Sequence, residues 1–238
     1  EVMDNSLKDL AGKAIEIAKK CGAQQAGARA SRSREVSLEW RNGKVETVQE
    51  SVSRGLSIRL YVDGRYSATA TSDLRIAAIE SFVATAAAMT RQLEPDPLRT
   101  LPDPALYAGR PDADLQIADP KVLMVSPDDR RRRAAELEEA ARAVPGADRI
   151  ISVTTGVSDS EGESVLVHSN GFAGAHRSTA FWISAETPVK GEGDKRPEDW
   201  ASGGARFIAD IPPAAAVGKE ASARAIAMLG SAKGPSAR

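Results

Sequence analysis

Two Asn-Gly dipeptides, Asn42-Gly43 and Asn170-Gly171, are the features that most constrain the fold of this 238-residue chain. Asn-Gly between two strand-like segments is the strongest short-range signal for a β-hairpin, because both central residues of the tight turn take positive φ. Val36, Leu38 and Trp40 precede the first dipeptide and alternate with polar residues, as in a half-buried strand. We therefore expect an antiparallel hairpin at each dipeptide.

A third turn is expected at Asp63-Gly64, between a strand over residues 56–62 and another over 66–71. Segments of helical periodicity flank these strands, and much of their apolar surface is alanine, which occurs 41 times in the chain. The first helix covers residues 7–20, and the second follows Asp73 as its N-cap. The third follows Ser126-Pro127, and the last opens at Pro212-Pro213.

The order helix, strand, Asn-Gly hairpin, strand and helix thus occurs twice. We predict an α+β protein of two related αβ halves, each an antiparallel sheet covered by alanine-rich helices. The first half spans residues 1–93. The second spans residues 121–238, and we expect its last helix to lead into a C-terminal domain that the chain lacks.

Residues 94–120, between the halves, hold six of the 13 prolines and are predicted to be an extended connector. In the second half, the charged, glycine-containing segment 186–203 is expected to be a mobile loop. Residues 207–211 are expected to form a short strand.

Composition excludes several classes of function. Two histidines and one cysteine are too few for a disulfide framework or a cysteine-rich zinc module. The net charge of −1 argues against electrostatic nucleic-acid binding as the main role, because that binding scales with the number of phosphates neutralised. No apolar segment reaches the roughly 20 residues of a membrane span. Because a single cysteine is typical of proteins in a reducing compartment, we expect a cytoplasmic protein.

No catalytic constellation is evident among the remaining candidates. His168 and His176 flank the second Asn-Gly turn out of register, so we interpret them as strand-surface residues and not as metal ligands. The run Arg130–Arg133 points all round a helix and is interpreted as a solvated helix start. Glutamates at positions 35, 39, 46 and 50 are interpreted as exposed strand charges.

We therefore predict no catalytic or metal-binding residue and leave the substrate-binding residues open. The predicted structural positions are the turn residues Asn42, Gly43, Asp63, Gly64, Asn170 and Gly171.

The order of short motifs resembles the TldD/PmbA family. Five stretches carry the likeness: Arg41-Asn42-Gly43-Lys44-Val45-Glu46, Gly55-Leu56-Ser57-Ile58-Arg59-Leu60, Thr71-Ser72-Asp73-Leu74, Val125-Ser126-Pro127-Asp128 and Ser169-Asn170-Gly171-Phe172. The pattern runs along nearly the whole chain. The Ser-Asn-Gly-Phe turn is more similar to the PmbA (TldE) branch than to TldD.

This resemblance implies part of a two-subunit zinc metallopeptidase that processes peptides. In that pair, TldD carries a His-Glu-x-x-x-His zinc motif and the PmbA/TldE partner is catalytically silent. This sequence has no match to the motif, so we expect no cofactor in this chain, and zinc only on a TldD-type partner. The expected partners are a TldD-like subunit or a second copy, together with a peptide substrate. Membrane and nucleic acid are not expected as partners.

Two alternatives remain open. The older family name suggests a modulator of DNA gyrase or another nucleic-acid-associated regulator. The chain could also be the N-terminal half of a TldD-type metallopeptidase whose zinc motif lies downstream.

Overall fold

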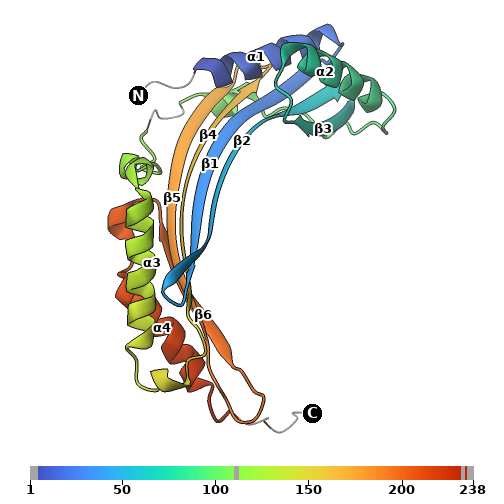
Figure 1. Ribbon diagram of the computed structural model, residues 1–238. Helices are drawn as coiled ribbons and strands as arrows, with labels where there is room; N and C mark the ends of the chain where they lie inside the picture. The colour runs from blue at the N-terminus through green and yellow to red at the C-terminus, as the bar shows by residue number, and fades with distance from the viewer. Residues whose placement is uncertain (1–4, 110–112, 232–233, 235–238) are drawn as a thin grey trace. The chain divides into compact units, whose positions relative to one another are not determined.

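The computed structural model describes residues 5–109, 113–231 and 234. Its helices and strands follow the order helix, three strands, helix, and then the same order again (Figure 1). In chain order the elements are α1 (Asn5–Lys20), β1 (Gln25–Arg41), β2 (Lys44–Val62), β3 (Arg65–Thr71), α2 (Ile76–Thr90), α3 (Pro127–Arg142), β4 (Thr154–His168), β5 (Ala173–Pro188), β6 (Glu198–Ala205) and α4 (Ala214–Ala227).

The strands form one six-stranded antiparallel sheet in the order β3-β2-β1-β4-β5-β6. The predicted α+β class is confirmed, and each half contributes three strands and two helices. The sequence did not indicate that the strands of the two halves join in a single sheet. This joining depends on β1 and β4 being neighbours, and no local signal encodes that contact.

The chain divides into two compact units. The first unit comprises Glu1–Arg34, Val52–Gln116 and Gly162–Arg177, and the second comprises Glu35–Ser51, Ile117–Glu161 and Ser178–Arg238. The four long strands β1, β2, β4 and β5 therefore each contribute residues to both units.

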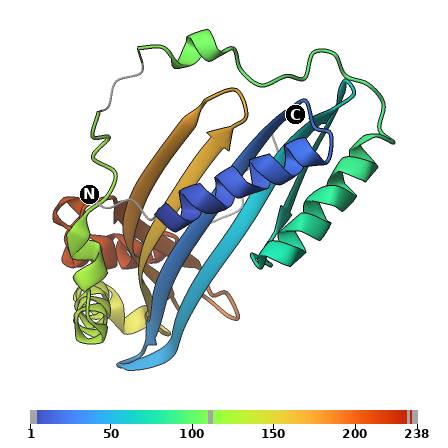
Figure 2. The ribbon, with the colours of Figure 1, turned by 90° about the horizontal axis from the view of Figure 1, so that it is seen from above.

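The core of the first unit lies between its helices and one face of its strands (Figure 2). Alanines at positions 26, 28 and 30 of β1 are separated by Gly27 and Arg29, and all three are fully buried. Their small side chains allow α1 to approach the sheet closely, and α1 itself presents Ala11, Ala14 and Ala18 to this core. Many of the chain's alanines thus lie at the contact between helix and sheet, where small side chains are needed.

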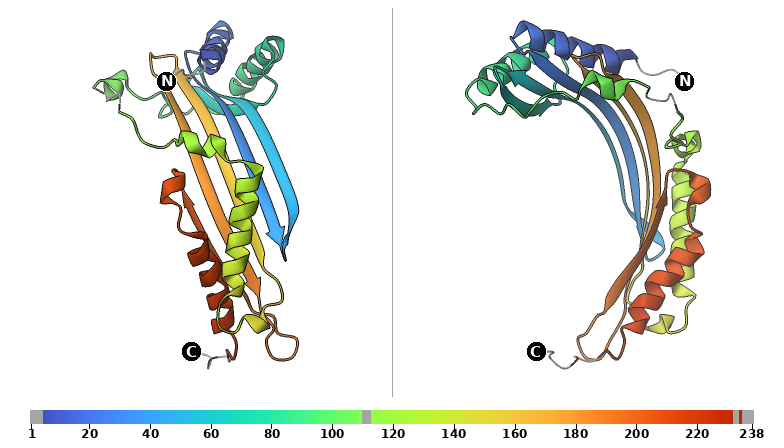
Figure 3. Two further views of the ribbon diagram at one scale, coloured as in Figure 1. Left: turned by 60° about the vertical axis from the view of Figure 1, so that its left-hand side comes forward. Right: turned by 180° about the vertical axis from the view of Figure 1, so that it is seen from behind.

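In the second unit, α3 and α4 lie side by side against the sheet (Figure 3). Leu137 of α3 and Val217 of α4 share a core with Phe181 and Ile183 of β5. The two helices touch backbone to backbone at Gly218, where a Cβ atom would lie 2.2 Å from Leu137 O. The absence of a side chain at Gly218 sets the spacing of this helix pair.

Two expectations for the second half differ from the structure. Segment 186–203 is not a loop throughout, because β5 continues to Pro188 and pairs with β6 from the pair Pro188–Glu198 onward, and only residues 189–197 connect these strands. Residues 207–211 do not form a strand, since Ile208–Asp210 is a 3-10 helix. The buried Asp119 carboxylate accepts a hydrogen bond from Ile208 N at 2.9 Å. This backbone N–H is therefore bonded to a side chain and not to a neighbouring strand.

The start of α2 also differs from expectation. Asp73 does not cap this helix, which begins at Ile76 after Arg75 and has no side-chain cap. Instead, the Asp73 carboxylate accepts hydrogen bonds from Arg75 N and Arg75 Nε, so it is engaged before the helix begins. By contrast, Ser126 caps α3 as predicted and forms a reciprocal capping box with Asp129.

The arginine run at the start of α3 is not uniformly solvated. Arg130 is 5% exposed and forms a two-point ion pair with Asp159 of β4, through Nε at 2.5 Å and Nη2 at 2.9 Å. Arg131 and Arg132 make exposed ion pairs within the helix, and Arg133 lies over the Phe181 ring. The four side chains do point in different directions, as expected, but the interpretation of Arg130 as a solvated residue was wrong.

Candidate functional site

The first Asn-Gly turn is held against α3 by one carboxylate. Asn42 and Gly43 have φ values of 47° and 83°, which a type I′ turn requires. The buried Glu138 carboxylate accepts hydrogen bonds from Trp40 Nε1 at 2.6 Å, Gly43 N at 2.8 Å and Arg142 Nε at 2.8 Å. Arg142 also donates to Asn42 Oδ1. The tip of the hairpin is therefore fixed to α3 within the second unit.

Burial alone would raise the pKa of Glu138, but hydrogen bonds from Arg142, Gly43 N and Trp40 together lower it below its ordinary value. We expect Glu138→Ala to lower the free energy of unfolding by about 2 kcal/mol, because a buried charged acceptor is removed from three donors. Denaturant unfolding followed by tryptophan fluorescence measures this loss.

The matched control is Glu136→Ala, whose side chain is 50% exposed and pairs with Arg132 at 3.8 Å. This control should cost less than about 1 kcal/mol. The contribution of Glu138 should be present at neutral pH and should disappear as the pH falls through its lowered pKa. Equal losses in both variants would contradict the role assigned to Glu138.

The Asp63-Gly64 turn has the same left-handed geometry, with φ values of 50° and 71°. Gln24 holds this turn from the loop after α1: its Nε2 donates to Asp63 Oδ1 at 3.1 Å, and Asp63 N donates to its Oε1 at 2.8 Å. These hydrogen bonds hold the β2–β3 turn, and we interpret Asp63 and Gly64 as structural residues.

The second Asn-Gly turn holds the proline-rich connector within the first unit. Gly171 has a φ of 102°, and Asn170 Nδ2 donates to Pro102 O at 2.8 Å. Tyr107 lies in the short 3-10 helix Pro104–Tyr107, and its hydroxyl donates to the same carbonyl at 3.2 Å. The turn thus acts as a docking point for residues 101–107.

His168 is not the strand-surface residue predicted from the sequence. It is 7% exposed, with Nδ1 3.0 Å from Tyr107 Oη, and its ring packs on Phe172 and on the backbone at Gly27. Since Tyr107 donates to Pro102 O, His168 Nδ1–H is assigned as the donor to Tyr107. Nε2 is buried without a hydrogen-bond partner. His176 is exposed, and the structure does not bring the two histidines together as ligands.

Burial, followed by the charge of Arg59, lowers the pKa of His168 below its ordinary value of 6.5. The unfolded chain therefore takes up a proton at a higher pH than the folded chain does. We expect the stability of the first unit to be complete above pH 6.5 and to fall as the pH drops toward the lowered pKa. Urea unfolding at pH 7.5, 6.5 and 5.5, followed by circular dichroism, tests this.

His168→Phe should flatten that pH dependence, and the exposed control His176→Gln should leave it unchanged. If His168→Phe retains the wild-type pH dependence, the assignment to His168 is wrong.

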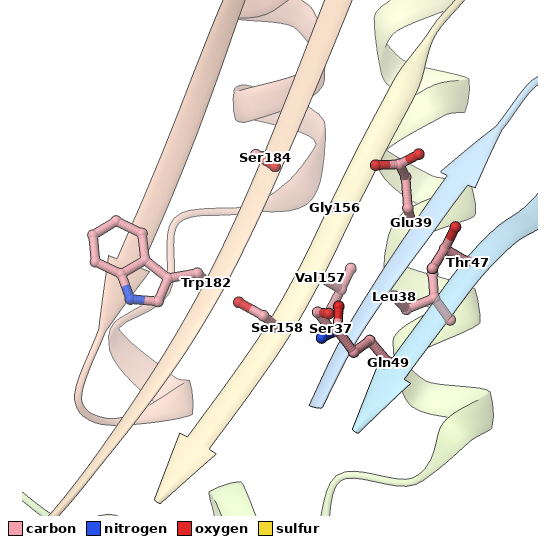
Figure 4. Close-up of a pocket in the computed structure, with 10 residues that line it drawn as sticks. All are labelled: Ser37, Leu38, Glu39, Thr47, Gln49, Gly156, Val157, Ser158, Trp182 and Ser184. Carbon is pink, nitrogen blue, oxygen red and sulfur yellow. The ribbon is translucent and has the colours of Figure 1, made fainter. Parts of the chain in front are cut away.

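The second unit has an open sheet face opposite α3 and α4. Buried residues such as Leu38, Val157 and Ile183 point to the helices, so the alternating positions between them point away. A pocket of about 290 Å³ opens on this face (Figure 4). Its lining residues come from four strands: Ser37, Leu38, Glu39, Thr47, Gln49, Gly156, Val157, Ser158, Trp182 and Ser184.

Trp182 is the one aromatic residue of this lining, and it is 51% exposed. Its indole lies over Gly204 of β6, where a Cβ atom would come within 2.2 Å of the ring. Gly204 stands directly opposite Trp182 in the β5–β6 register. Sequence reasoning missed this pair because β6 was interpreted as loop.

The chemical character of the pocket is that of a binding surface. The pocket is lined by the hydroxyls of Ser37, Ser158 and Ser184, by the carboxylate of Glu39 and, at one side, by Trp182. Glutamates 35, 39, 46 and 50 are exposed, as predicted, and Glu39 is the one that lines the pocket. Among the described residues, no group of three His, Cys, Asp or Glu side chains could hold a metal ion.

Comparison with known proteins identifies the family. Residues 26–90 match the family model described as PmbA/TldA metallopeptidase domain 1, and residues 120–229 match the PmbA/TldA metallopeptidase central domain. The chain belongs to the PmbA/TldD family, as its turn motifs indicated. Metalloprotease PmbA of Escherichia coli O157:H7 is 30% identical over 234 residues, covering 96% of this chain and 50% of that protein.

Solved structures agree with this assignment. A crystal structure from Bacteroides thetaiotaomicron, described as a modulator of DNA gyrase, is 33% identical with a TM-score of 0.89; the match covers 98% of this chain and 52% of that one. TldE from Thermococcus kodakarensis has the same fold, with a TM-score of 0.72 at 16% identity over 91% of this chain and 47% of that one. The chain spans about half the length of the relatives it matches.

In the part of the chain that the structure describes, no helix combines the length and hydropathy needed for a membrane span.

Proposed function

We propose that this chain forms the scaffold region of a PmbA/TldE-like subunit in a cytoplasmic peptide-processing enzyme. The subunit binds a TldD-like partner and helps to position the peptide, while the zinc-dependent cleavage takes place on the partner. The observation that carries this proposal is the 30% identity with Metalloprotease PmbA along 96% of the chain.

The side chains present do not suit a zinc site. Catalytic zinc requires three protein ligands from His, Cys or carboxylate side chains, and the described residues contain no such cluster. His168 is enclosed by Gly27, Tyr107 and Phe172, and Cys21 packs against the first unit's core. We therefore assign no zinc-dependent step to this region, and in the proposal zinc belongs to the TldD-like partner.

The open sheet face of the second unit supports a positioning role. An extended peptide needs a surface with hydrogen-bonding groups and a few anchor points, and the pocket offers serine hydroxyls beside an exposed indole. These groups bind without taking part in bond cleavage.

Association with the partner tests the proposal directly. When the intact protein is mixed with a TldD-like subunit, we expect sedimentation analysis to detect a complex that contains both chains. Two non-interacting species at micromolar concentration would refute the proposed function.

A further inference from the structure

The open face of the second unit carries two exposed tryptophans and an excess of carboxylates. Trp182 on β5 is 51% exposed and Trp200 on β6 is 60% exposed. Trp182 is followed by Ile183 and Trp200 by Ala201, and both of these buried residues face the helices. Because neighbouring residues of a strand point to opposite faces, both indoles lie on the open face. In β1, β4, β5 and β6, the same alternation places five charged residues of this unit on the open face: Glu35, Glu39, Glu186, Glu198 and Arg41.

The strand register gives the spacing of the tryptophans. Trp182 stands opposite Gly204, and Trp200 stands opposite Glu186. Trp200 and Gly204 are four positions apart on β6, which corresponds to about 13 Å along the strand at a rise of about 3.3 Å per residue. In an extended peptide, residues i and i+4 are the same distance apart and point to the same side.

We propose that this face binds an extended cationic peptide segment that carries two basic side chains at positions i and i+4. The inference rests on the proposed function, because it names the class of peptide that the subunit positions. One guanidinium or ammonium group stacks on Trp182 at the pocket that Glu39 lines, and the other stacks on Trp200 beside Glu186. The hydroxyl of Ser184, two residues from Trp182 toward Glu186 on β5, faces the peptide, and Ser158 lines the pocket beside Trp182.

The negative charge of the open face favours a cationic peptide over other ligands that could stack on tryptophan. A single-stranded nucleic acid also stacks on indoles, but its phosphates would meet four carboxylates and one arginine. An acidic peptide meets the same repulsion. A cationic segment pairs with the carboxylates and uses the indole faces.

Three labelled 12-residue peptides with a serine and threonine background test the spacing. The first carries arginine at i and i+4, the second carries arginine at i and i+3, and the third carries glutamate at i and i+4. Fluorescence anisotropy with the intact protein at low salt measures their affinities. We expect the i, i+4 arginine peptide to bind about fivefold more tightly than the i, i+3 peptide, whose two side chains point to opposite sides, and the glutamate peptide to bind most weakly.

Variants test the two anchors separately. Trp182→Leu and Glu186→Gln should each weaken binding of the i, i+4 arginine peptide about threefold. Gly204→Val should have a similar effect, because it displaces the indole while retaining it. The control Glu80→Gln removes an exposed carboxylate from α2 in the first unit and should leave the affinity unchanged. Circular dichroism verifies that each variant folds.

Equal affinities for the three peptides, or wild-type affinity in both Trp182→Leu and Glu186→Gln, would overturn the inference. A nucleic-acid oligomer that competes for the face at equal concentration would also overturn it. These outcomes are separate from the partner test: loss of selectivity with intact binding of the TldD-like subunit refutes only this inference. Failure of the wild-type protein to bind that subunit refutes the proposed function.

Discussion

Asp159→Asn should lower the free energy of unfolding of the second unit by about 3–5 kcal/mol, because the substitution leaves the Arg130 guanidinium buried without its counter-charge. Both side chains are almost fully enclosed, with 6% and 3% of their surface exposed. Asparagine has nearly the same shape as aspartate, so the change isolates the loss of charge from a loss of volume.

Tryptophan fluorescence during urea unfolding is the appropriate measurement for Asp159→Asn. All three tryptophans, Trp40, Trp182 and Trp200, belong to the second unit, so their emission reports on this unit alone.

Two controls complete the Asp159 experiment. Asp128→Asn removes a carboxylate that is 89% exposed and pairs with Arg131 at 2.7 Å, and it should cost less than about 1 kcal/mol. The double substitution of Arg130 by methionine and Asp159 by leucine should recover most of the stability, since no buried charge remains. If Asp159→Asn costs no more than Asp128→Asn, the buried pair does not have the structural role assigned to it.

Gly218→Ala is expected to lower stability by about 1–3 kcal/mol, and Gly218→Val by more. The added Cβ atom would lie 2.2 Å from Leu137 O and 3.1 Å from Ala141 N, both of which are backbone atoms of α3. Neither atom can move aside as a side chain could, so α4 must shift away from α3 and lose contacts in the shared core. Thermal unfolding followed by tryptophan fluorescence measures the effect.

Gly12→Ala in α1 is the matched control for Gly218. No atom lies within 4 Å of a Cβ atom at this position, and alanine has the higher helix propensity. The substitution should therefore raise stability by about 0.5–1 kcal/mol, which circular dichroism detects. A stabilising effect of Gly218→Ala would contradict the close helix approach.

Local sequence signals predicted most of the elements. The Asn-Gly and Asp-Gly dipeptides predicted the three turns because turn chemistry is local. The expected positive φ at both residues is found at Asn42-Gly43 and Asp63-Gly64, but at the second Asn-Gly only Gly171 has it. Ser126-Pro127 predicted the start of α3 because capping involves only neighbouring residues. Strand β6 was missed because its glycines and charges do not alternate clearly. Its pairing with β5 is a long-range contact that its own residues do not encode.

Buried polar groups and the candidate binding face were harder to predict for a related reason. Arg130 resembles its three neighbours in the sequence, and only the position of Asp159 on β4 explains its burial. His168 was interpreted as exposed because the segment that covers it, around Tyr107, is more than 60 residues away. That Trp182 and Trp200 lie on the same face follows from the β5–β6 register, which the sequence alone does not indicate.

The most direct test of the central claim is the rate at which a TldD-like subunit cleaves a peptide substrate with and without the intact protein. We expect little cleavage by the TldD-like subunit alone, no cleavage by this protein alone, and zinc-dependent cleavage when both are present. Cleavage by this protein alone, or a partner whose rate does not change when this protein is added, would contradict the assignment of a scaffold role to this chain.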